Sequence, residues 1–537
     1  MFRRKFLSSA LGASACALAA RSARAASAFV DLDPTRPGAA ISPLLHGHFI
    51  EHLGGVIYDG VWVGEDSRIP NVGGIRKALI DALKPLRPPV IRWPGGCFAD
   101  SYNWRDGVGP RAARPVRTSF WMDVGQLAQQ AGGPQRFEPN WFGTSEFVRF
   151  CRLSGAEPYI AGDVRSLPAR DFYEWIDYCN SPAGSTTLAR LREQGGDRDP
   201  FNVRLWGVGN ESWGCGGEMT PEEYSTAFRR YTAWTPGMGV PLAFIASGPD
   251  GGAAGDSIGW TDRFFGSLAA KNPGLVDRVW GWALHYYCGT AGKSPIDFTT
   301  AEWYELLAKA NRMETLIERH WSALAVHDPG RHVKLAIDEW GAWHNGGTEP
   351  APAYIFAQQS SLRDALIAGL TLDTFQRHPE KVGMACVAQM INCLHGLFLA
   401  YEDKFTLTPN YHVFAMYAAH QGGAKVPAVI DTEARASSNQ PPLPELSGSA
   451  SLKNRVLTLT VVHTRHDAQT ERTIRLRGAS AKSVNATVLS HAELRAHNTF
   501  DAPRNVEPVQ QSLNVSGPEF VVRFAPASVT KLEIELL

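Results

Sequence analysis

The feature that most constrains this chain is an alternation of short apolar segments with amphipathic segments between residues 44 and 420. The apolar segments have the length and β-branched content of buried strands, and they lie at residues 45–50, 90–93, 158–161, 204–208, 242–246, 279–285, 333–337 and 384–388. Helical periodicity separates them, at residues 75–86, 144–153, 187–194, 221–235, 260–270, 301–325 and 354–374. Eight strands interleaved with helices predict an α/β fold, a (β/α)8 TIM barrel over residues 44–420.

Two glutamates stand where predicted strands end. Glu211 lies in GVGNESW, residues 207–213, and Glu339 lies in KLAIDEWGAW, residues 334–343. Because the C-terminal ends of barrel strands meet at one mouth, we expect the two carboxylates to face each other. Glycoside hydrolysis needs such a pair, with one carboxyl protonated for the leaving oxygen and one ionised to attack the anomeric carbon. The sequence therefore predicts a glycosidase.

Beyond about residue 420 the pattern changes. Alternating segments replace the helical periodicity, at residues 456–462, 473–476, 483–489, 520–524 and 529–536. This alternation favours an all-β sandwich domain over residues 421–537. A lone predicted strand near Val30, within residues 26–43, is expected to join that sandwich.

The first 25 residues resemble a twin-arginine signal peptide. Arg3 and Arg4 precede a short apolar stretch at residues 7–20, and a small-residue cleavage site follows at residues 23–25. The stretch is shorter than the ~20 residues that a membrane span requires. We therefore expect a cleaved signal, within a few residues of this site, and a periplasmic or secreted protein.

Charge and cysteine content exclude several function classes. Lys and Arg total 53, as do Asp and Glu, which argues against nucleic acid or an anionic membrane as partner. Seven cysteines follow the predicted signal, at positions 97, 151, 179, 215, 288, 386 and 393. Their spacing matches neither a zinc site nor a disulfide framework, and an odd number leaves at least one cysteine free.

Ten ordered motifs carry a family resemblance. They are HGHFIEHLGGVIYDGVW (46–62), VIRWPGGCFADSYNWRDGVGPR (90–111), FGTSEF (142–147), GAEPYI (155–160), DYCNSPAGST (177–186), WGVGNESWG (206–214), LHYY (284–287), IDEWGAWHN (337–345), AQMINCLHG (388–396) and LTPNYHVFAMYAAH (407–420). Together they resemble the α-L-arabinofuranosidases of glycoside hydrolase family 51. The resemblance implies a clan-A (β/α)8 barrel with a C-terminal β-sandwich, and hydrolysis by double displacement with retention of configuration.

The resemblance also implies the catalytic roles. Glu211 matches the general acid/base and Glu339 the nucleophile. We expect Trp206, Trp213 and Trp340 to provide a low-dielectric surround. Repulsion from Glu339 should keep Glu211 protonated until glycosylation neutralises the nucleophile, after which Glu211 can act as a base toward water.

Other positions match the family's sugar ligands. Asn210 matches the asparagine that binds the 2-hydroxyl, while Glu51 and Gln389 match residues that hydrogen-bond the furanose hydroxyls. Tyr287 matches a tyrosine that hydrogen-bonds the nucleophile. The alternative for each is a buried polar side chain with a purely structural role.

Aromatic and cysteine positions complete the predicted subsite. Trp121 and Trp343 match aromatics that line the pocket, although a core ring remains a strong alternative for Trp121, as a structural role does for His285. Cys97 stands after Pro-Gly-Gly, where many family members have asparagine. We expect its thiol to line the arabinose subsite without acting chemically.

The leading interpretation is an exo-acting enzyme that releases terminal non-reducing α-L-arabinofuranosyl groups from hemicellulose or pectic oligosaccharides. The alternative within the family is an endo-β-1,4-glucanase or xylanase, which would need an open cleft instead of a one-sugar pocket. A catalytically silent carbohydrate-binding protein would not need both glutamates. No cofactor and no metal are implied, and the resemblance suggests a homo-oligomer.

Overall fold

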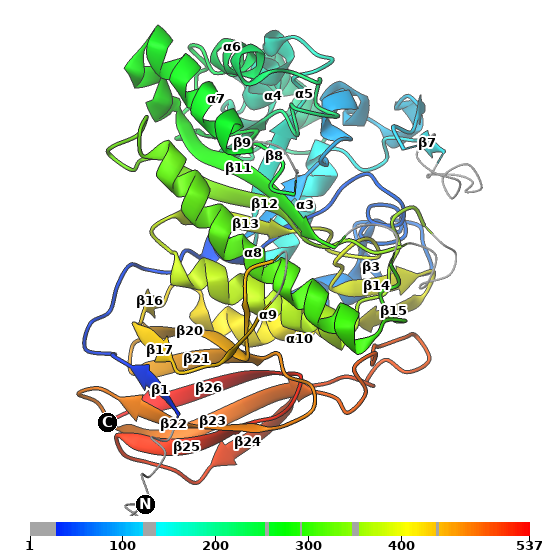
Figure 1. The fold of residues 1–537 in the computed structure, drawn as a ribbon. Coiled ribbons are helices and arrows are strands. Elements are labelled where there is room, and N and C mark those ends of the chain that lie inside the picture. The colour runs from blue at the N-terminus through cyan, green and yellow to red at the C-terminus, as the bar shows by residue number, and fades with distance from the viewer. Residues whose placement is uncertain (1–27, 122–135, 253–256, 290–292, 346–353, 437–439) are drawn as a thin grey trace, which may run out of the picture.

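The computed structural model describes residues 28–121, 136–252, 257–289, 293–345, 354–436 and 440–537 (Figure 1). The predicted signal peptide, residues 1–25, lies outside the described residues. Within the described part of the chain, no helix combines the length and apolar character needed to cross a membrane.

A closed barrel of eight parallel strands forms the larger part of the molecule (Figure 1). In barrel order the strands are β2 (Gly47–Phe49), β5 (Val90–Trp93), β8 (Glu157–Gly162), β9 (Leu205–Val208), β10 (Ala243–Ala246), β11 (Val279–Cys288), β12 (Lys334–Ala342) and β13 (Val382–Val387). All neighbours pair in parallel, and β13 closes the barrel onto β2. The predicted (β/α)8 barrel is confirmed.

Helices cover the outside of the barrel. The α-helices are α1 (Lys77–Leu83), α3 (Thr144–Ser154), α4 (Ala169–Asn180), α5 (Thr187–Gln194), α6 (Pro221–Tyr231), α7 (Ser257–Lys271), α8 (Thr300–Leu324), α9 (Leu362–Arg377) and α10 (Pro409–Tyr417). Short 3-10 helices are η1 (Pro43–His46), η2 (Ala99–Ser101), η3 (Trp104–Gly107), η4 (Arg111–Ala113), η6 (Pro273–Arg278) and η7 (Ala418–His420). Helical periodicity in the sequence does not predict α4 or α10. Helix α10 is buried on nearly every side, so its sequence carries no amphipathic stripe.

The predicted helix at 354–374 begins later than expected, at Leu362. A capping box explains this start, because Asp364 Oδ2 accepts hydrogen bonds from the main-chain nitrogen and the hydroxyl of Ser361, at 2.8 and 2.9 Å.

Two facing sheets form the C-terminal β-sandwich. The six-stranded sheet contains, in order, β16 (Ala424–Lys425), β20 (Leu446–Lys453), β21 (Val456–His463), β26 (Ser528–Leu536), β23 (Ala481–Ser490) and β24 (Val509–Leu513). The four-stranded sheet contains β17 (Ala428–Ile430), β1 (Phe29–Leu32), β22 (Thr470–Leu476) and β25 (Glu519–Phe524). Alternate residues such as Leu457, Leu459 and Val461 of β21 enter the core that includes Val30 and Ile474. The predicted sandwich is confirmed.

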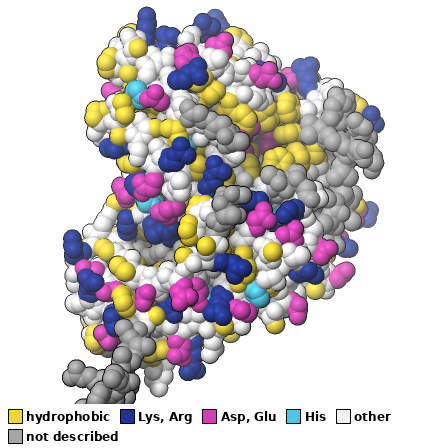
Figure 2. Space-filling view, viewed as in Figure 1, with side chains coloured by type: hydrophobic (Ala, Val, Ile, Leu, Met, Phe, Trp, Pro, Cys, Tyr) yellow, Lys and Arg dark blue, Asp and Glu magenta, His cyan; other side chains and the backbone are white. Residues whose placement is uncertain are grey.

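The described residues also form four short two-stranded sheets outside the barrel and the sandwich. They are β3 (Asn71–Val72) with β4 (Ile75–Arg76), β6 (Arg117–Thr118) with β7 (Phe137–Glu138), β14 (Phe398–Tyr401) with β15 (Lys404–Leu407), and β18 (Ala434–Arg435) with β19 (Leu443–Pro444). On the face drawn in Figure 2, acidic and basic side chains are interspersed, and hydrophobic side chains border a hollow in the upper half.

Helices α9 and α10 lie between the barrel and the six-stranded sheet (Figure 1). Asp373 of α9 is buried at this junction and accepts hydrogen bonds from Ser449 and Thr460 of the sheet and Tyr417 of α10, at 2.6 to 2.9 Å. Burial raises the pKa of Asp373 to about 7, although the hydroxyl of Thr460 opposes this shift. The junction therefore holds a buried carboxyl group that keeps its proton to a higher pH than an exposed aspartate does.

Candidate active site

The two predicted carboxylates meet at the C-terminal mouth of the barrel. Glu211 follows β9, and Glu339 lies in β12 opposite His285 of β11. One oxygen of each carboxylate and one ring nitrogen of His285 lie within 4.8 Å of one another. Carboxyl groups about 5 Å apart allow direct attack on a sugar held between them, whereas inverting enzymes place them about 6.5 to 9.5 Å apart to admit a water molecule.

Both oxygens of Glu339 have hydrogen-bond donors. Arg92 Nη1 donates to Oε1 at 2.7 Å, and the hydroxyl of Tyr287 donates to Oε2 at 2.8 Å. Gly96 lies against the same carboxylate, since a Cβ there would stand 2.6 Å from Oε1. These contacts therefore fix the orientation of the Glu339 carboxylate.

The two oxygens of Glu211 have different surroundings. Oε1 lies 2.9 Å from His285 Nδ1, while Oε2 faces the sulfurs of Cys215 and Cys97 at 3.6 and 3.8 Å. Burial raises the pKa of Glu211, the hydrogen bond from His285 opposes this shift, and the negative charge of Glu339 adds to it. A carboxyl group in this position suits proton donation.

His285 connects Glu211 to a buried aspartate. Its Nδ1 contacts Glu211, and its Nε2 lies 3.2 Å from Asp338 Oδ1. Burial opposes protonation of this ring, but Glu339, Asp338 and Glu211 outweigh it and raise the pKa of His285 to about 10. A protonated His285 donates its Nδ1 proton to Glu211 Oε1, so the acidic proton of Glu211 belongs on Oε2.

Arg92 and Asp338 form ion pairs with the groups around the two glutamates: Arg92 pairs with Glu339, and Asp338 pairs with His285. Burial opposes the charge of Arg92, but Asp338 and Glu339 raise the pKa of its guanidinium well above the usual value. Burial would raise the pKa of Asp338 as well, yet Arg92 and His285 lower it to about 2. The hydroxyl of Tyr159 also donates to Asp338 Oδ2 at 2.7 Å. The site thus rests on a network of buried, paired charges.

The predicted sugar ligands Glu51, Gln389 and Asn210 border the same mouth. Gln389 Nε2 donates to Glu51 Oε2 at 2.9 Å, and Gln389 Oε1 is buried without a hydrogen-bond partner among the described residues. Burial, together with the charge of Glu339, raises the pKa of Glu51 to about 8. Asn210 Oδ1 accepts from Arg92 Nη2 at 2.7 Å. Arg92 thereby links Asn210 to Glu339.

Aromatic rings line one side of the site. Tyr287 contacts Trp343 edge to face, with ring centroids 5.5 Å apart, and Phe356 contacts both Trp343 and Trp121, at 5.0 and 5.6 Å. The structure therefore brings both predicted tryptophans into one row of rings. Phe356 joins them and is absent from the sequence prediction, because nothing in its local sequence distinguishes it from a core residue.

The prediction for the cysteines is wrong in one respect. Cys97 and Cys215 form a disulfide, so Cys97 offers no thiol. The pair is separated by 118 residues, a spacing that no local motif reveals. The loops after β5 and β9 nevertheless meet, because only β8 lies between these strands in the barrel. The other five cysteines among the described residues are free and buried.

The predicted tryptophan surround is also wrong in part. Trp206 contacts Phe172 of α4, and Trp340 contacts Phe375 of α9 and stacks on Phe414 of α10. Both rings face the helices because successive side chains of a strand point to opposite sides. The catalytic carboxylates are desolvated by other groups of the barrel mouth.

Arg92, Asp338 and His285 surround the paired glutamates with charge, and neither Arg92 nor Asp338 is among the site residues predicted from the sequence. A usable pattern is present, because Arg92 is the one charged residue of the apolar strand β5 and Asp338 follows the apolar segment Leu335–Ile337 inside the buried part of β12. Such residues are rarely buried unless they are paired.

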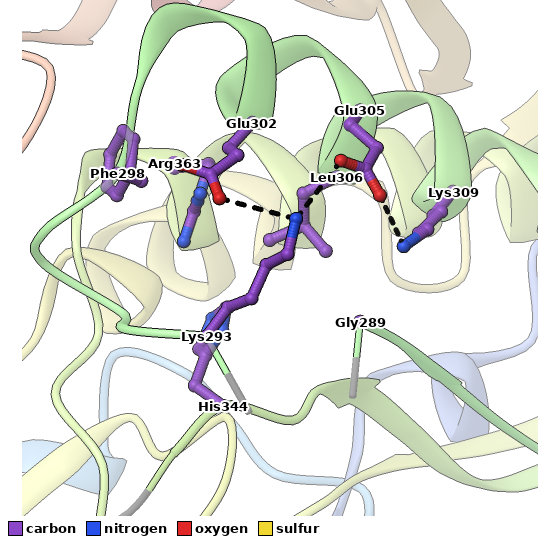
Figure 3. A pocket seen from close by; sticks show the side chains of 9 residues that line it. All are labelled: Gly289, Lys293, Phe298, Glu302, Glu305, Leu306, Lys309, His344 and Arg363. Atoms are coloured by element: carbon purple, nitrogen blue, oxygen red, sulfur yellow. Dashed lines mark hydrogen bonds and ion pairs between the residues drawn. The ribbon is translucent and has the colours of Figure 1, made fainter. Parts of the chain in front are cut away.

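A separate small cavity lies beside α8 (Figure 3). Its volume is about 40 Å³, and Lys293 crosses it to reach Glu302 and Glu305, at 3.3 Å each. Ligand sites usually enclose about 300 Å³ or more. Ion pairs occupy this cavity, and it lies apart from the paired glutamates.

Comparison with known proteins assigns the family. Residues 82–248 match the α-L-arabinofuranosidase 1 domain, and residues 338–528 match the α-L-arabinofuranosidase C-terminal domain. An intracellular exo-α-L-arabinofuranosidase of Bacteroides ovatus is 34% identical over 499 residues, covering 91% of this chain and 92% of the relative. The chain belongs to glycoside hydrolase family 51.

Solved structures of family 51 enzymes agree. The arabinofuranosidase of Xanthomonas axonopodis pv. citri is 35% identical with a TM-score of 0.86, and the Thermotoga maritima enzyme in complex with arabinose is 28% identical with a TM-score of 0.81. Each comparison covers 95% of this chain and 100% of the other. The Bacteroides ovatus relative is named as intracellular, so that similarity gives the predicted signal peptide no support.

Proposed function

We propose that the protein is a retaining exo-glycosidase that hydrolyses terminal non-reducing α-L-arabinofuranosyl residues of hemicellulose or pectic oligosaccharides. The observation that carries this proposal is the short separation of two differently supported carboxyl groups, Glu211 and Glu339. The named activities of its family 51 relatives agree with it and do not favour the endo-glucanase or xylanase alternative.

Glu339 acts as the nucleophile. The donors Arg92 and Tyr287 hold its carboxylate toward the anomeric carbon, where it forms the glycosyl-enzyme bond as the glycosidic bond breaks. Glu211 gives its proton to the departing oxygen in the same step. Once glycosylation neutralises Glu339, Glu211 accepts a proton from water, which then hydrolyses the intermediate.

The sugar sits between the carboxylates and the row of aromatic rings. Glu51, Gln389 and Asn210 bind its hydroxyls, and the unpartnered Oε1 of Gln389 is one acceptor available to them. Trp121 and Trp343 line the pocket with Tyr287, while Cys97 contributes shape as half of a disulfide. These groups suit one neutral furanose ring, which favours exo action.

The remaining assignments concern the whole protein. Residues 44–420 form the catalytic unit, residues 421–537 with the strand in 26–43 form the sandwich domain, and residues 1–25 direct export to the periplasm or medium. The protein forms a homo-oligomer. Mass spectrometry of the mature N-terminus after expression in a twin-arginine-competent host tests the export assignment, and an unprocessed N-terminus in the cytoplasmic fraction refutes it.

Glu211→Ala provides the test of the mechanism. An activated nitrophenolate leaves without protonation, whereas a sugar alkoxide does not, so natural oligosaccharides should lose far more kcat/KM than nitrophenyl α-L-arabinofuranoside. Added azide should rescue deglycosylation and yield a glycosyl azide of retained configuration. Equal losses for all leaving groups, with no azide product, would overturn the acid/base role.

Assays on matched substrates test the specificity. Purified enzyme should release arabinose from nitrophenyl α-L-arabinofuranoside and from arabino-oligosaccharides. The corresponding β-xyloside, β-glucoside and unsubstituted xylan or glucan serve as controls. Rapid loss of polymer viscosity on an unsubstituted β-1,4-glucan would instead favour the endo-acting alternative.

A further inference from the structure

The disulfide between Cys97 and Cys215 lies against Oε2 of Glu211, the oxygen to which we assign the acidic proton. Cys97 ends the Pro-Gly-Gly segment after β5, and Cys215 follows Glu211 by four residues. Both sulfurs are within 4 Å of Glu211 Oε2, whereas Oε1 is occupied by His285. Among the described residues, only these sulfurs lie within hydrogen-bonding range of Oε2.

The oxidation state of this pair decides whether Oε2 meets a hydrogen-bond donor. A thiol carries a proton that can be donated to a carboxylate, while a disulfide sulfur carries none. A donor on Oε2 would stabilise the ionised form of Glu211 and compete with the glycosidic oxygen for the correct position. Neither effect operates while the two sulfurs are bonded to each other.

We propose that the Cys97–Cys215 disulfide is a positioning element that keeps Glu211 Oε2 free of donors, so that this oxygen retains its proton and delivers it to the leaving group. This inference rests on the proposed function of Glu211 as general acid. It gives the disulfide an influence on Glu211 in which the sulfurs take no part in bond making or breaking.

Other charged groups around Glu211 also affect its ionisation, whatever the state of the disulfide. His285 of β11 contacts Oε1, Glu339 of β12 lies across the mouth, and Asp250, after β10, adds negative charge. Asp338 pairs with His285 and favours its protonated form, and His285 in turn contacts Glu211. These groups are common to the oxidised and reduced enzyme, so a change confined to the sulfurs isolates the contribution of a donor at Oε2.

Two double variants separate the donor effect from the loss of the covalent tether. Cys97→Ser/Cys215→Ser removes the tether and places hydroxyl donors beside Oε2, whereas Cys97→Ala/Cys215→Ala removes the tether and adds no donor. Both should lose stability alike. The experiment measures kcat/KM against pH for phenyl α-L-arabinofuranoside, whose leaving group needs protonation. Oxidised wild type and wild type reduced with a phosphine complete the set.

The alkaline limb of the profile reports the ionisation of the general acid. We expect the limb of the serine variant to lie about one pH unit below that of oxidised wild type, because hydrogen bonds to the charged form lower a carboxyl pKa. Reduced wild type should shift in the same direction by less, since a thiol is a weaker donor. The alanine variant should keep the limb of oxidised wild type, whatever its absolute rate.

Alkylation of exposed thiols followed by mass spectrometry establishes the redox state of each sample, and melting temperatures establish that each variant folds. Equal limbs in the alanine and serine variants would overturn the inference. So would an unshifted limb in wild type whose disulfide is shown to be reduced. Azide rescue of Glu211→Ala keeps the two proposals apart: its failure overturns the acid/base role, whereas rescue without any limb shift overturns only the role of the disulfide.

Discussion

Gly96→Ala perturbs the proposed nucleophile without altering any catalytic group. The added Cβ would stand 2.6 Å from Glu339 Oε1, a contact that real Cβ atoms essentially never make. Oε1 must therefore withdraw by about 0.4 Å to reach the 3.0 Å limit, and by about 0.8 Å to reach an ordinary 3.4 Å contact. That movement shifts the carboxylate away from the position set by Arg92, 2.7 Å away.

The displacement sets the expected loss of activity. A misplacement of about 1 Å at a reacting centre can cost about 100-fold in rate. Scaling the logarithm of that factor to 0.4–0.8 Å gives a loss of about 6- to 40-fold, or about 1.1 to 2.2 kcal/mol of transition-state stabilisation. The loss should appear in kcat/KM for nitrophenyl α-L-arabinofuranoside, which reports the glycosylation step.

Two neighbouring glycines provide controls. In Gly95→Ala the added Cβ would meet Glu51 Cγ at 2.7 Å, so this variant should weaken sugar binding and raise KM. In Gly214→Ala the added Cβ meets only the main-chain oxygen of Glu211, at 3.8 Å, and kcat/KM should stay within about twofold. A folded Gly96→Ala enzyme with the kinetics of wild type would refute the argument that Glu339 must hold this position.

Other substitutions separate chemistry, binding and stability. Glu339→Ala should lose nearly all turnover while its circular dichroism stays native, because no covalent intermediate can form; retained turnover on aryl arabinofuranosides would refute the nucleophile assignment. Asn210→Ala should lower kcat more than it raises KM if its 2-hydroxyl contact strengthens in the transition state, whereas a change in KM alone would mark uniform binding. Asp373→Asn should gain stability relative to wild type as pH rises from about 4 to 7, because the unfolded carboxyl ionises near pH 4 while the folded pKa is about 7. The gain should reach at most about 4 kcal/mol and stay level above pH 7; a difference in melting temperature that is independent of pH would contradict it.

The local sequence was sufficient for the barrel and for the two glutamates. Strand and helix periodicity depend on neighbouring residues, and the closed parallel barrel follows from eight such units. Glu211 and Glu339 were recognisable because each stands where an apolar strand segment stops, which in a barrel places both at one mouth. The predicted helix at 354–374 differs from α9 mainly at its start, where Ser361 caps the helix, and α9 also continues to Arg377.

Only the tertiary structure decided which groups surround those glutamates. Cys97 and Cys215 pair across 118 residues, and Arg92 reaches Glu339 and Asn210 from a third strand. Such contacts depend on strand order and register in the closed barrel. Strand order and register cannot be deduced from the spacing of residues along the sequence. The alternation of side chains along β9 also directs Trp206 toward helix α4 and away from the barrel interior. The catalytic pair can thus be recognised from short segments of the sequence. Its electrostatic environment forms only when the fold brings distant strand ends within hydrogen-bonding distance.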